Sequence, residues 1–392
     1  MCSPTKFSKT LTATLATLAL VFGMFSSSIA QEHGQETGGV VDSHAVEADH
    51  ADDHTDSHAD LDNAHGGHRE FKAGDLIMSH IADSHEWHIA GSHEHPISIP
   101  LPIILYHPEK GLDVFLSSKF EHGNTTHNGY GIDHDKIFVA DESGHKDEAA
   151  TSKLWDLSLT KNAVGLIVSC ILLLWLMLKV AKAYKKRPGQ APKGLQNGVE
   201  VIINFVRNDI AKAMIGEKKY EKFLPFLLTL FFFIWINNIM GLIPIFPGGA
   251  NVTGNVAIPL VLAFFTFILV NINGNKHYWR HIFAMPGIPI PILIILTPIE
   301  ILQIFIRPVV LMIRLFANIM AGHIGMLVFF SLIFIFSKNG ESVVGGYATA
   351  PFSIAFTVFL YFLELLVGAI QAYVFTLLAS IYIGMAVVED HH

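Results

Sequence analysis

An apolar stretch from Gly287 to Phe336 contains side chains that could do chemistry, namely Glu300, Arg307, Arg314, Asn318 and His323. A hydrophobic run of this length is typical of membrane-embedded helix. A charged side chain at the centre of a bilayer costs at least ~2.5 kcal/mol, so Arg314 needs a specific reason to be there. No Asp or Glu lies within one helical turn of Arg314. We therefore expect its compensating charge to come from another helix or another subunit.

Arg314, His323 and Glu364 differ in what they can do with protons. A guanidinium group keeps its proton at physiological pH, so Arg314 cannot be a proton carrier. It lowers the pKa of any carboxylate that comes near, and it forms a fixed positive barrier to hydrated protons. His323 and Glu364 both titrate, and a nearby carboxylate can keep an imidazole switchable near neutral pH. Together the three side chains predict a proton path that ends near an arginine.

The same polar side chains have a structural interpretation, in which they pair with one another and hold helices together. For Asn318 or Gln371 alone, this interpretation and a functional one are equally favoured. The set as a whole favours function, because ionisable groups inside a membrane are functional sites by default. Glu300 is a weaker candidate because it lies near the cytoplasmic end of the stretch, and Arg307 could pair with it or extend to the interface.

The length of the Gly287–Phe336 stretch indicates how these groups are positioned. A helix of about 50 residues runs ~75 Å, whereas the hydrocarbon core is only ~30 Å thick. The middle of the stretch has no loop composition, so we expect one steeply tilted helix, bent where Pro298 and Pro308 remove backbone donors. On such a helix Glu300, Arg307, Arg314 and Asn318 fall within about 40° of one another, and His323 projects from the side opposite Arg314.

A second over-long apolar helix is predicted from Pro351 to Val388. It carries its own polar set at spacings of three, four and three residues, which places the set on one stripe: Tyr361, Glu364, Gly368 and Gln371. A carboxylate and an amide inside the membrane should face protein or water and not lipid. The two long helices are therefore the elements expected to hold the candidate site.

Composition places the chain among membrane proteins. It has 392 residues, 51% of them hydrophobic, and a mean hydropathy of +0.43, which is typical of a polytopic protein. Its charge is uneven: residues 31–150 contain 24 Asp and Glu against 6 Lys and Arg, together with 17 of the 22 histidines. With Cys2 in a segment expected to be removed and Cys170 in an apolar helix, no disulfide framework is expected.

Four regions follow from this pattern. Residues 1–30 have a basic start, an apolar core and a small-residue cleavage site, as a signal peptide does, although a retained anchor is the alternative. Residues 31–70 are His- and Asp-rich, with almost no large apolar side chains, and should be disordered. Residues 71–150 contain short strand-like runs broken by Pro and Gly, which indicates a small, partly β extracytoplasmic domain. Residues 151–392 form the membrane domain.

The membrane domain is predicted to be all-α and polytopic, with about five transmembrane helices and one cytoplasmic surface helix in Pro188–Lys219. Basic residues follow the first span and mark a cytoplasmic end, so the mature N-terminus is extracytoplasmic and the C-terminus cytoplasmic. The expected spans are Leu157–Val180, Phe223–Ile243, Asn251–Ile272, Gly287–Phe336 and Pro351–Val388.

The histidines of the N-terminal region have two interpretations. His50, His54 and His58, and the pair His93 and His95, could bind zinc or collect protons. The alternative, which the composition favours, is a solvated acidic tail. No metal site and no cofactor is therefore assigned to the chain.

Three motifs carry a resemblance to a known family. Residues Met312–His323, with Arg314, Asn318 and His323 among them, closely resemble the motif of subunit a of the F-type ATP synthase. Gln371–Leu378 resembles that family's second signature, and Asn237–Pro244 matches its earlier span. The resemblance covers Leu157–Val388. The N-terminal extension to Ala150 departs from the family's compact core, so no role is transferred to it.

The resemblance implies a proton-conducting stator subunit of a rotary ATP synthase in a bacterial inner membrane. In such proteins two tilted helices embrace a ring of small hairpin subunits, and the arginine, here Arg314, faces the ring's carboxylates between two aqueous half-channels. By position, Glu300 would lie along the cytoplasmic exit. The extracytoplasmic half-channel would contain Asn318, His323, Glu364 and Gln371. Some members have an acid at the position of His323 and a histidine at the position of Glu364. Many members have Gly where this chain has Ala317.

The resemblance also implies partners: the c-ring, subunit b of the peripheral stalk, the soluble F1 sector and membrane lipid, with no nucleic acid. The chain lacks a phosphate-binding Gly-rich loop, so it is not expected to hydrolyse ATP and is assigned no catalytic residue. The alternative is a stand-alone secondary transporter for a cation such as zinc. That class often has internal repeats, which this chain lacks, and the buried positive charge is a poor host for a cation. The sequence leaves the choice between H⁺ and Na⁺ open.

Overall fold

The computed structural model describes residues 74, 77, 83–90, 97–123, 125–133, 135–141, 143–243, 248–285, 288–337 and 342–387. The signal peptide expected in residues 1–30 and the tract in residues 31–70 lie outside this set. So do all five histidines considered for zinc binding: His50, His54, His58, His93 and His95.

The N-terminal part of the described chain is a small β region. Strands β1 (Glu86–Ala90) and β2 (Ile97–Pro100) pair with each other, as do β5 (Tyr130–Asp133) and β6 (Lys136–Val139). Between them β4 (Gly111–Leu116), β3 (Pro102–His107) and β7 (Trp155–Asp156) form an antiparallel sheet. Side chains alternate along β3, so that Ile103 and Leu105 are fully buried against Phe120 and Tyr130. The partly β region expected from the sequence is therefore present.

The β region extends beyond the expected boundary at Ala150. Helix α3 (Glu148–Thr151) spans that boundary, and β7 follows it because Trp155 and Asp156 pair with β3. The first long helix, α4 (Lys161–Lys186), begins four residues later than the Leu157 expected. Residues 157 and 159 still belong to the sheet side, since their amides donate to the carbonyls of Ile104 and Pro102. Thr160 then caps α4 by accepting from the Ala163 amide.

Within the described residues, four helices are long and apolar enough to cross a membrane: α4, α7 (Tyr220–Leu242), α10 (Ile290–Phe336) and α11 (Val343–Val387). A fifth is counted when α8 (Ala257–Ile272) and α9 (Lys276–Phe283), which meet at a bend of 102°, are taken as one broken span. The chain is thus a mostly helical, multi-pass membrane protein with a small β region, as predicted.

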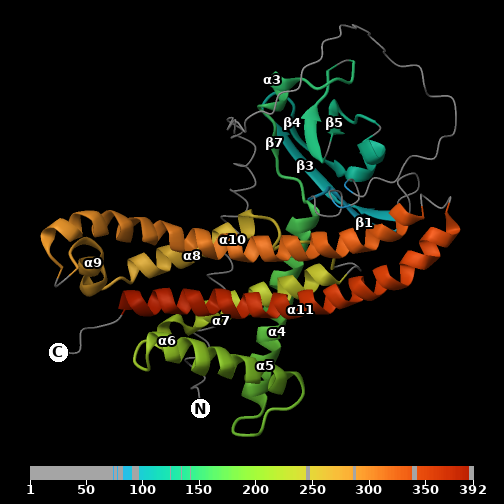
Figure 1. Cartoon of the computed structure of the whole chain (residues 1–392). Helices are drawn as coiled ribbons and strands as arrows, with labels where there is room; N and C mark the ends of the chain where they lie inside the picture. The colour runs from blue at the N-terminus through green and yellow to red at the C-terminus, as the bar shows by residue number, and fades with distance from the viewer. Residues whose placement is uncertain are drawn as a thin grey trace, which may run out of the picture.

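Helix α10 is continuous over 47 residues, including Pro298 and Pro308. The prediction of one long helix, in place of two spans with a turn, is therefore confirmed. At ~1.5 Å per residue it is ~70 Å long. Figure 1 shows α10 and α11 lying side by side and running across α4 rather than along it, which is the arrangement expected of steeply tilted helices.

The expected start of the last helix at Pro351 is wrong, because α11 begins at Val343 and includes Pro351. The earlier start is stabilised by Ser342, whose hydroxyl accepts from the Gly345 amide at 3.2 Å. Gly345 also lies so close to the Phe336 carbonyl that a Cβ would not fit. Residues 343–350, which the sequence placed outside the last span, therefore belong to α11.

The surface helix expected in Pro188–Lys219 is present as α5 (Leu195–Phe205), the π-helical turn η2 (Val206–Lys212) and α6 (Ala213–Ile215). This segment packs under the C-terminal half of α11 (Figure 1). Ser380 donates to the Ile210 carbonyl at 3.3 Å, and Gly384 lies against the Met214 carbonyl where a Cβ would clash. The surface segment therefore supports the end of α11 that lies away from the β region.

Candidate functional site

His323 on α10 and Glu364 on α11 form a buried acid–imidazole pair. The Nε2 of His323 lies 3.6 Å from the Oε1 of Glu364, and the two side chains are 8% and 4% exposed. Neither carboxylate oxygen of Glu364 has a hydrogen-bond partner among the described residues. A carboxylate buried without donors is costly, whereas a proton held by either group of the pair lowers that cost. The pair is therefore suited to hold and pass on a single proton.

Gly322 leaves room for this pair, and Gly241 borders it. A Cβ on Gly322 would lie 2.8 Å from the Cδ of Glu364, closer than real Cβ contacts allow. A Cβ on Gly241, near the end of α7, would lie 3.7 Å from the Nε2 of His323. Glu364 thus approaches the α10 backbone through a gap that only glycine provides, and α7 forms a third wall beside the imidazole.

Asn238 joins α7 to α11 one helical turn beyond Glu364. Its Nδ2 donates to the Gly368 carbonyl at 2.9 Å, and its Oδ1 accepts from the Thr253 hydroxyl at 2.8 Å. The side chains of Asn238 and Thr253 are both buried. Asn251, two residues before Thr253, donates from its side-chain amide to the sulfur of Met320 on α10. Asn238 stood in a quoted motif but was not assigned a role from the sequence. Thr253 carried no sequence signal, because its contact depends on a loop conformation.

Arg314 and Asn318 lie on the other side of α10. One stripe of α10 faces the protein and consists of buried residues four apart: Leu311, Leu315, Ile319 and His323. Arg314 and Asn318 are exposed and lie outside this stripe. The opposite placement of Arg314 and His323 is as the helical periodicity predicted. Among the residues that the structure describes, none forms an ion pair or hydrogen bond with the Arg314 guanidinium. The cation therefore faces outward from the described part of the chain.

The remaining sequence candidates lie apart from the His323–Glu364 contact. Gln371 is buried on α11, in the same stripe as Glu364 and Gly368, as its spacing predicted. Glu300 is half-buried on α10, almost four turns before Arg314. The structure thus brings two of the six candidates into direct contact and distributes the other four along the two long helices.

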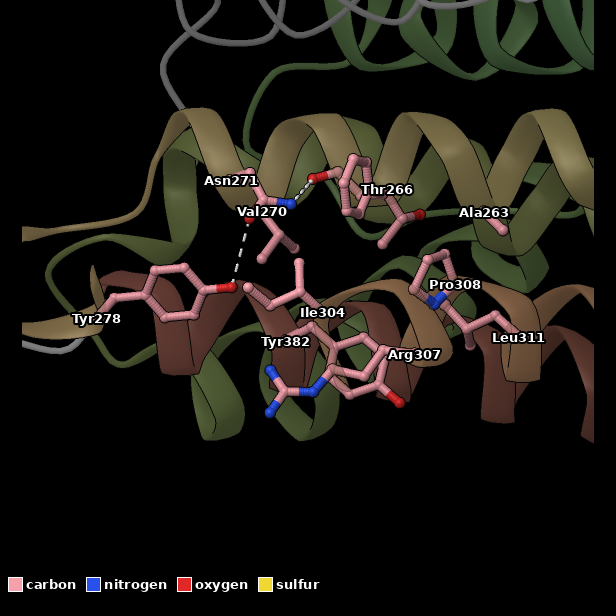
Figure 2. A pocket seen from close by; sticks show the side chains of 11 residues that line it. Ala263, Thr266, Val270, Asn271, Tyr278, Ile304, Arg307, Pro308, Leu311 and Tyr382 are labelled. Atoms are coloured by element: carbon pink, nitrogen blue, oxygen red, sulfur yellow. Dashed lines mark hydrogen bonds between the residues drawn. The ribbon is translucent and has the colours of Figure 1, made fainter. Parts of the chain in front are cut away.

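A small, mostly apolar hollow lies where α8, α9, α10 and α11 meet (Figure 2). Its cavity volume is about 20 Å³. In it the Tyr278 hydroxyl donates to Asn271 at 3.5 Å, and the guanidinium of Arg307 lies 5.6 Å from the centre of the Tyr382 ring. Arg307 also donates to Gln303 at 3.4 Å. Its charge is therefore stabilised by an amide and an aromatic face.

Charged groups also cluster where the β region joins α4. Asp156 accepts from the Ser158 amide at 2.9 Å and lies 3.7 Å from the Nε2 of buried His85. Burial alone would raise the pKa of Asp156, but the nearby His85 imidazole and the hydrogen bond from Ser158 outweigh it and hold the pKa below its ordinary value. Asp83 accepts from the Asn162 amide at 2.9 Å, yet burial raises the pKa of its carboxyl. This cluster fixes the β region to the helix.

Residues 163–384 match the protein family described as ATP synthase A chain. That match covers more than half of the 392 residues and spans α4 to α11. The chain belongs to the ATP synthase A chain family.

Relatives of known name extend this match. The chain is 34% identical over 381 residues to ATP synthase subunit a of Chlorobium phaeobacteroides (strain BS1), which covers 96% of this chain and 92% of the relative. It is 41% identical over 245 residues to ATP synthase subunit a of Chloroherpeton thalassium, covering 61% and 69% of the two chains. Residues 76–157 match a separate domain family of unknown function. The family membership therefore rests on the membrane helices, and the β region forms a further module.

Proposed function

We propose that this chain is the proton-translocating subunit of the membrane sector of a rotary ATP synthase. One observation carries the proposal: α10 presents Arg314 on an exposed face, with no carboxylate among the described residues to neutralise it. A permanent cation in an apolar helix is costly. Acidic groups on a moving ring of partner subunits, passing this face one after another, would offset that cost. We assign to the chain neither an enzymatic activity nor the role of another subunit of the complex.

The proposed proton route uses the two faces of α10. A proton enters past Glu364 and His323, with Asn318 and Gln371 along the same half-channel, and neutralises a carboxylate of the ring. After nearly a full turn the carboxylate returns to Arg314, whose charge lowers the carboxyl pKa and forces the proton off. The proton leaves along the path of Glu300. Arg314 itself keeps its proton throughout and blocks a direct leak between the half-channels.

The proposed orientation follows from charge. Five basic residues lie at the end of α4 opposite the β region and mark the cytoplasmic side: Lys179, Lys182, Lys185, Lys186 and Arg187. The β region is then extracytoplasmic. The loop with Ala250 and Val252 packs against Gly165, near the start of α4 on the same side. Asn238, Thr253 and the His323–Glu364 pair therefore belong to the extracytoplasmic half-channel, and the α11 C-terminus is cytoplasmic.

The substitution Arg314→Ala tests the proposal in inverted membrane vesicles. ATP-driven acidification should be abolished while the chain still copurifies with a ring of small hairpin subunits and a soluble ATPase. Arg280→Ala, which removes an exposed arginine of α9, should acidify at the wild-type rate. Vesicles with Arg314→Ala that acidify normally would refute the proposal, as would purification of the chain as a lone homodimer.

A further inference from the structure

Asn238 lies at the meeting point of three separate segments of the chain. It belongs to α7, it donates to a carbonyl of α11, and it accepts from a hydroxyl of the loop that follows α7. It is 4% exposed and Thr253 is 1% exposed. A backbone carbonyl can only accept, so the amide group of Asn238 must turn its nitrogen to Gly368 and its oxygen to Thr253. Both ends of the amide are therefore fixed by partners that do not belong to α7.

We propose that Asn238 and Thr253 are positioning residues that hold α11 at the height where Glu364 meets His323. This inference rests on the proposed function of the pair. Neither residue touches the transported proton in this proposal. They act through the Gly368 carbonyl, which lies one helical turn after Glu364 and on the same stripe of α11.

The two hydrogen bonds of Asn238, to the Gly368 carbonyl and from the Thr253 hydroxyl, are called the bridge below. The packing around the bridge explains why it can set the position of α11 relative to α7. A Cβ on Gly368 would lie 3.1 Å from the Cβ of Asn238, so the glycine is what lets α11 come close enough for the hydrogen bond. Three residues further along α7, a Cβ on Gly241 would lie 3.7 Å from the Nε2 of His323. The same face of α7 therefore holds α11 through Asn238 and borders α10 through Gly241.

The separation within the pair makes it sensitive to this placement. At 3.6 Å, Nε2 of His323 and Oε1 of Glu364 are just beyond hydrogen-bond distance. A shift of α11 by a few tenths of an ångström decides whether they share a proton directly. Hydrogen bonding to one protonation state changes the pKa of both groups. Loss of the bridge should therefore change the pH at which the half-channel loads, and not only the amount of folded protein.

The loop that carries Thr253 is itself held from both sides. Asn251 accepts from the Gly254 amide at 3.0 Å, and the neighbouring Ala250 and Val252 pack against Gly165 of α4, where a Cβ would lie 2.7 Å from Ala250. The hydroxyl of Thr253 is thus presented to Asn238 by a supported turn. Removal of this hydroxyl alone should loosen the amide without disturbing the helices.

The experiment uses the assembled synthase in inverted vesicles, with the membrane potential clamped and the internal pH varied. Thr253→Val and Asn238→Leu remove one and both arms of the bridge, and Gly368→Ala pushes the helices apart. Thr229→Val is the matched control, since Thr229 is also buried but its hydroxyl bonds only within α7, to the Pro225 carbonyl. ATP synthesis is measured against internal pH, with the amount of assembled complex determined in parallel.

We expect Thr253→Val and Asn238→Leu to lower the maximal rate about fivefold per lost hydrogen bond. They should also shift the internal pH of half-maximal synthesis by about half a unit, whereas Thr229→Val leaves both unchanged. A fall in rate with an unmoved midpoint would overturn the positioning role. Should Asn238→Leu fail to assemble, Thr253→Val decides the question, because valine keeps the shape of threonine. If Arg314→Ala blocks transport but the bridge variants match Thr229→Val, only this inference fails.

Discussion

The Nε2 of His323 and the Oε1 of Glu364 lie 3.6 Å apart, on two long helices that are adjacent along the chain, and both side chains are almost completely buried. Burial keeps both groups from solvent, so each depends on the other for its charge state. The pair is therefore the most sensitive point of the proposed half-channel.

Exchange of the two side chains should be milder than loss of either. His323→Glu combined with Glu364→His keeps one acid and one imidazole in contact, whereas His323→Ala or Glu364→Ala removes one side of that contact. We expect single substitutions to reduce ATP-driven pumping at least tenfold and the exchange to recover a measurable part of it. If the double variant pumps no faster than either single variant, the result counts against a functional pair.

The gap at Gly322 provides a steric test with a control one turn away. Gly322→Ala would place its Cβ 2.8 Å from Glu364, whereas the nearest atom to a Cβ on Gly325 is 4.0 Å away. Alanine is the better helix former by about 1 kcal/mol, so Gly325→Ala should be neutral or stabilising. Gly322→Ala should displace the carboxylate and lower the pumping rate several-fold. Equal rates for the two variants would show that Glu364 does not need this space.

Helical periodicity was sufficient to separate the two faces of α10. Arg314 and His323 are nine residues apart, which is half a turn out of phase, and both lie after Pro308 on one continuous stretch of the helix. The contact between His323 and Glu364 was likewise suggested by their chemistry. The carriage of protons by these residues stays a proposal, because side-chain placement alone does not test it.

Other features depended on contacts that no local pattern encodes. The start of α11 at Val343 results from a cap by Ser342 and a close approach of Gly345 to α10, so the proline at position 351 was a misleading signal. Thr253 becomes part of the site only because its loop returns to α7. Strand β7 has two residues, too few to show periodicity, and is defined by its pairing with β3.

Three donors from outside the helix satisfy the last described carbonyls of α11. The backbone amide of Asn275 donates to Ala386 at 2.9 Å, its Nδ2 donates to Val387 at 2.9 Å, and Lys219 Nζ donates to Val387 at 2.8 Å. Combining Lys219→Met with Asn275→Ala should lower the melting temperature of the purified chain by about 2–4 °C, because unsatisfied terminal carbonyls destabilise a helix. Lys218→Met removes a neighbouring exposed charge and should leave the melting temperature unchanged. If Lys218→Met lowers the melting temperature equally, the effect arises from net charge.

The buried carboxylate of Asp156 should make the attachment of the β region to α4 pH-dependent. The nearby His85 imidazole and the hydrogen bond from Ser158 hold the carboxyl pKa below the ordinary value of 3.8 in spite of burial. An acid with a lowered pKa in the folded state stabilises the fold above its ordinary pKa, and that contribution is lost as the pH falls through the lowered value. Protection of the Leu157 amide, which donates to Ile104, should therefore decrease below about pH 4.

Asp156→Asn should remove this pH dependence and lower stability at neutral pH by about 1–2 kcal/mol, the contribution of a hydrogen bond to a charged group. The measurement is hydrogen exchange of the Leu157 amide at several pH values, corrected for the intrinsic exchange rate. Glu109→Gln is the control, because Glu109 forms only an exposed pair with Lys153, and such pairs contribute little. If wild type and Asp156→Asn lose protection in parallel as the pH falls, the acid sensitivity arises elsewhere. In that case Asp156 holds the junction through its shape and not through its charge.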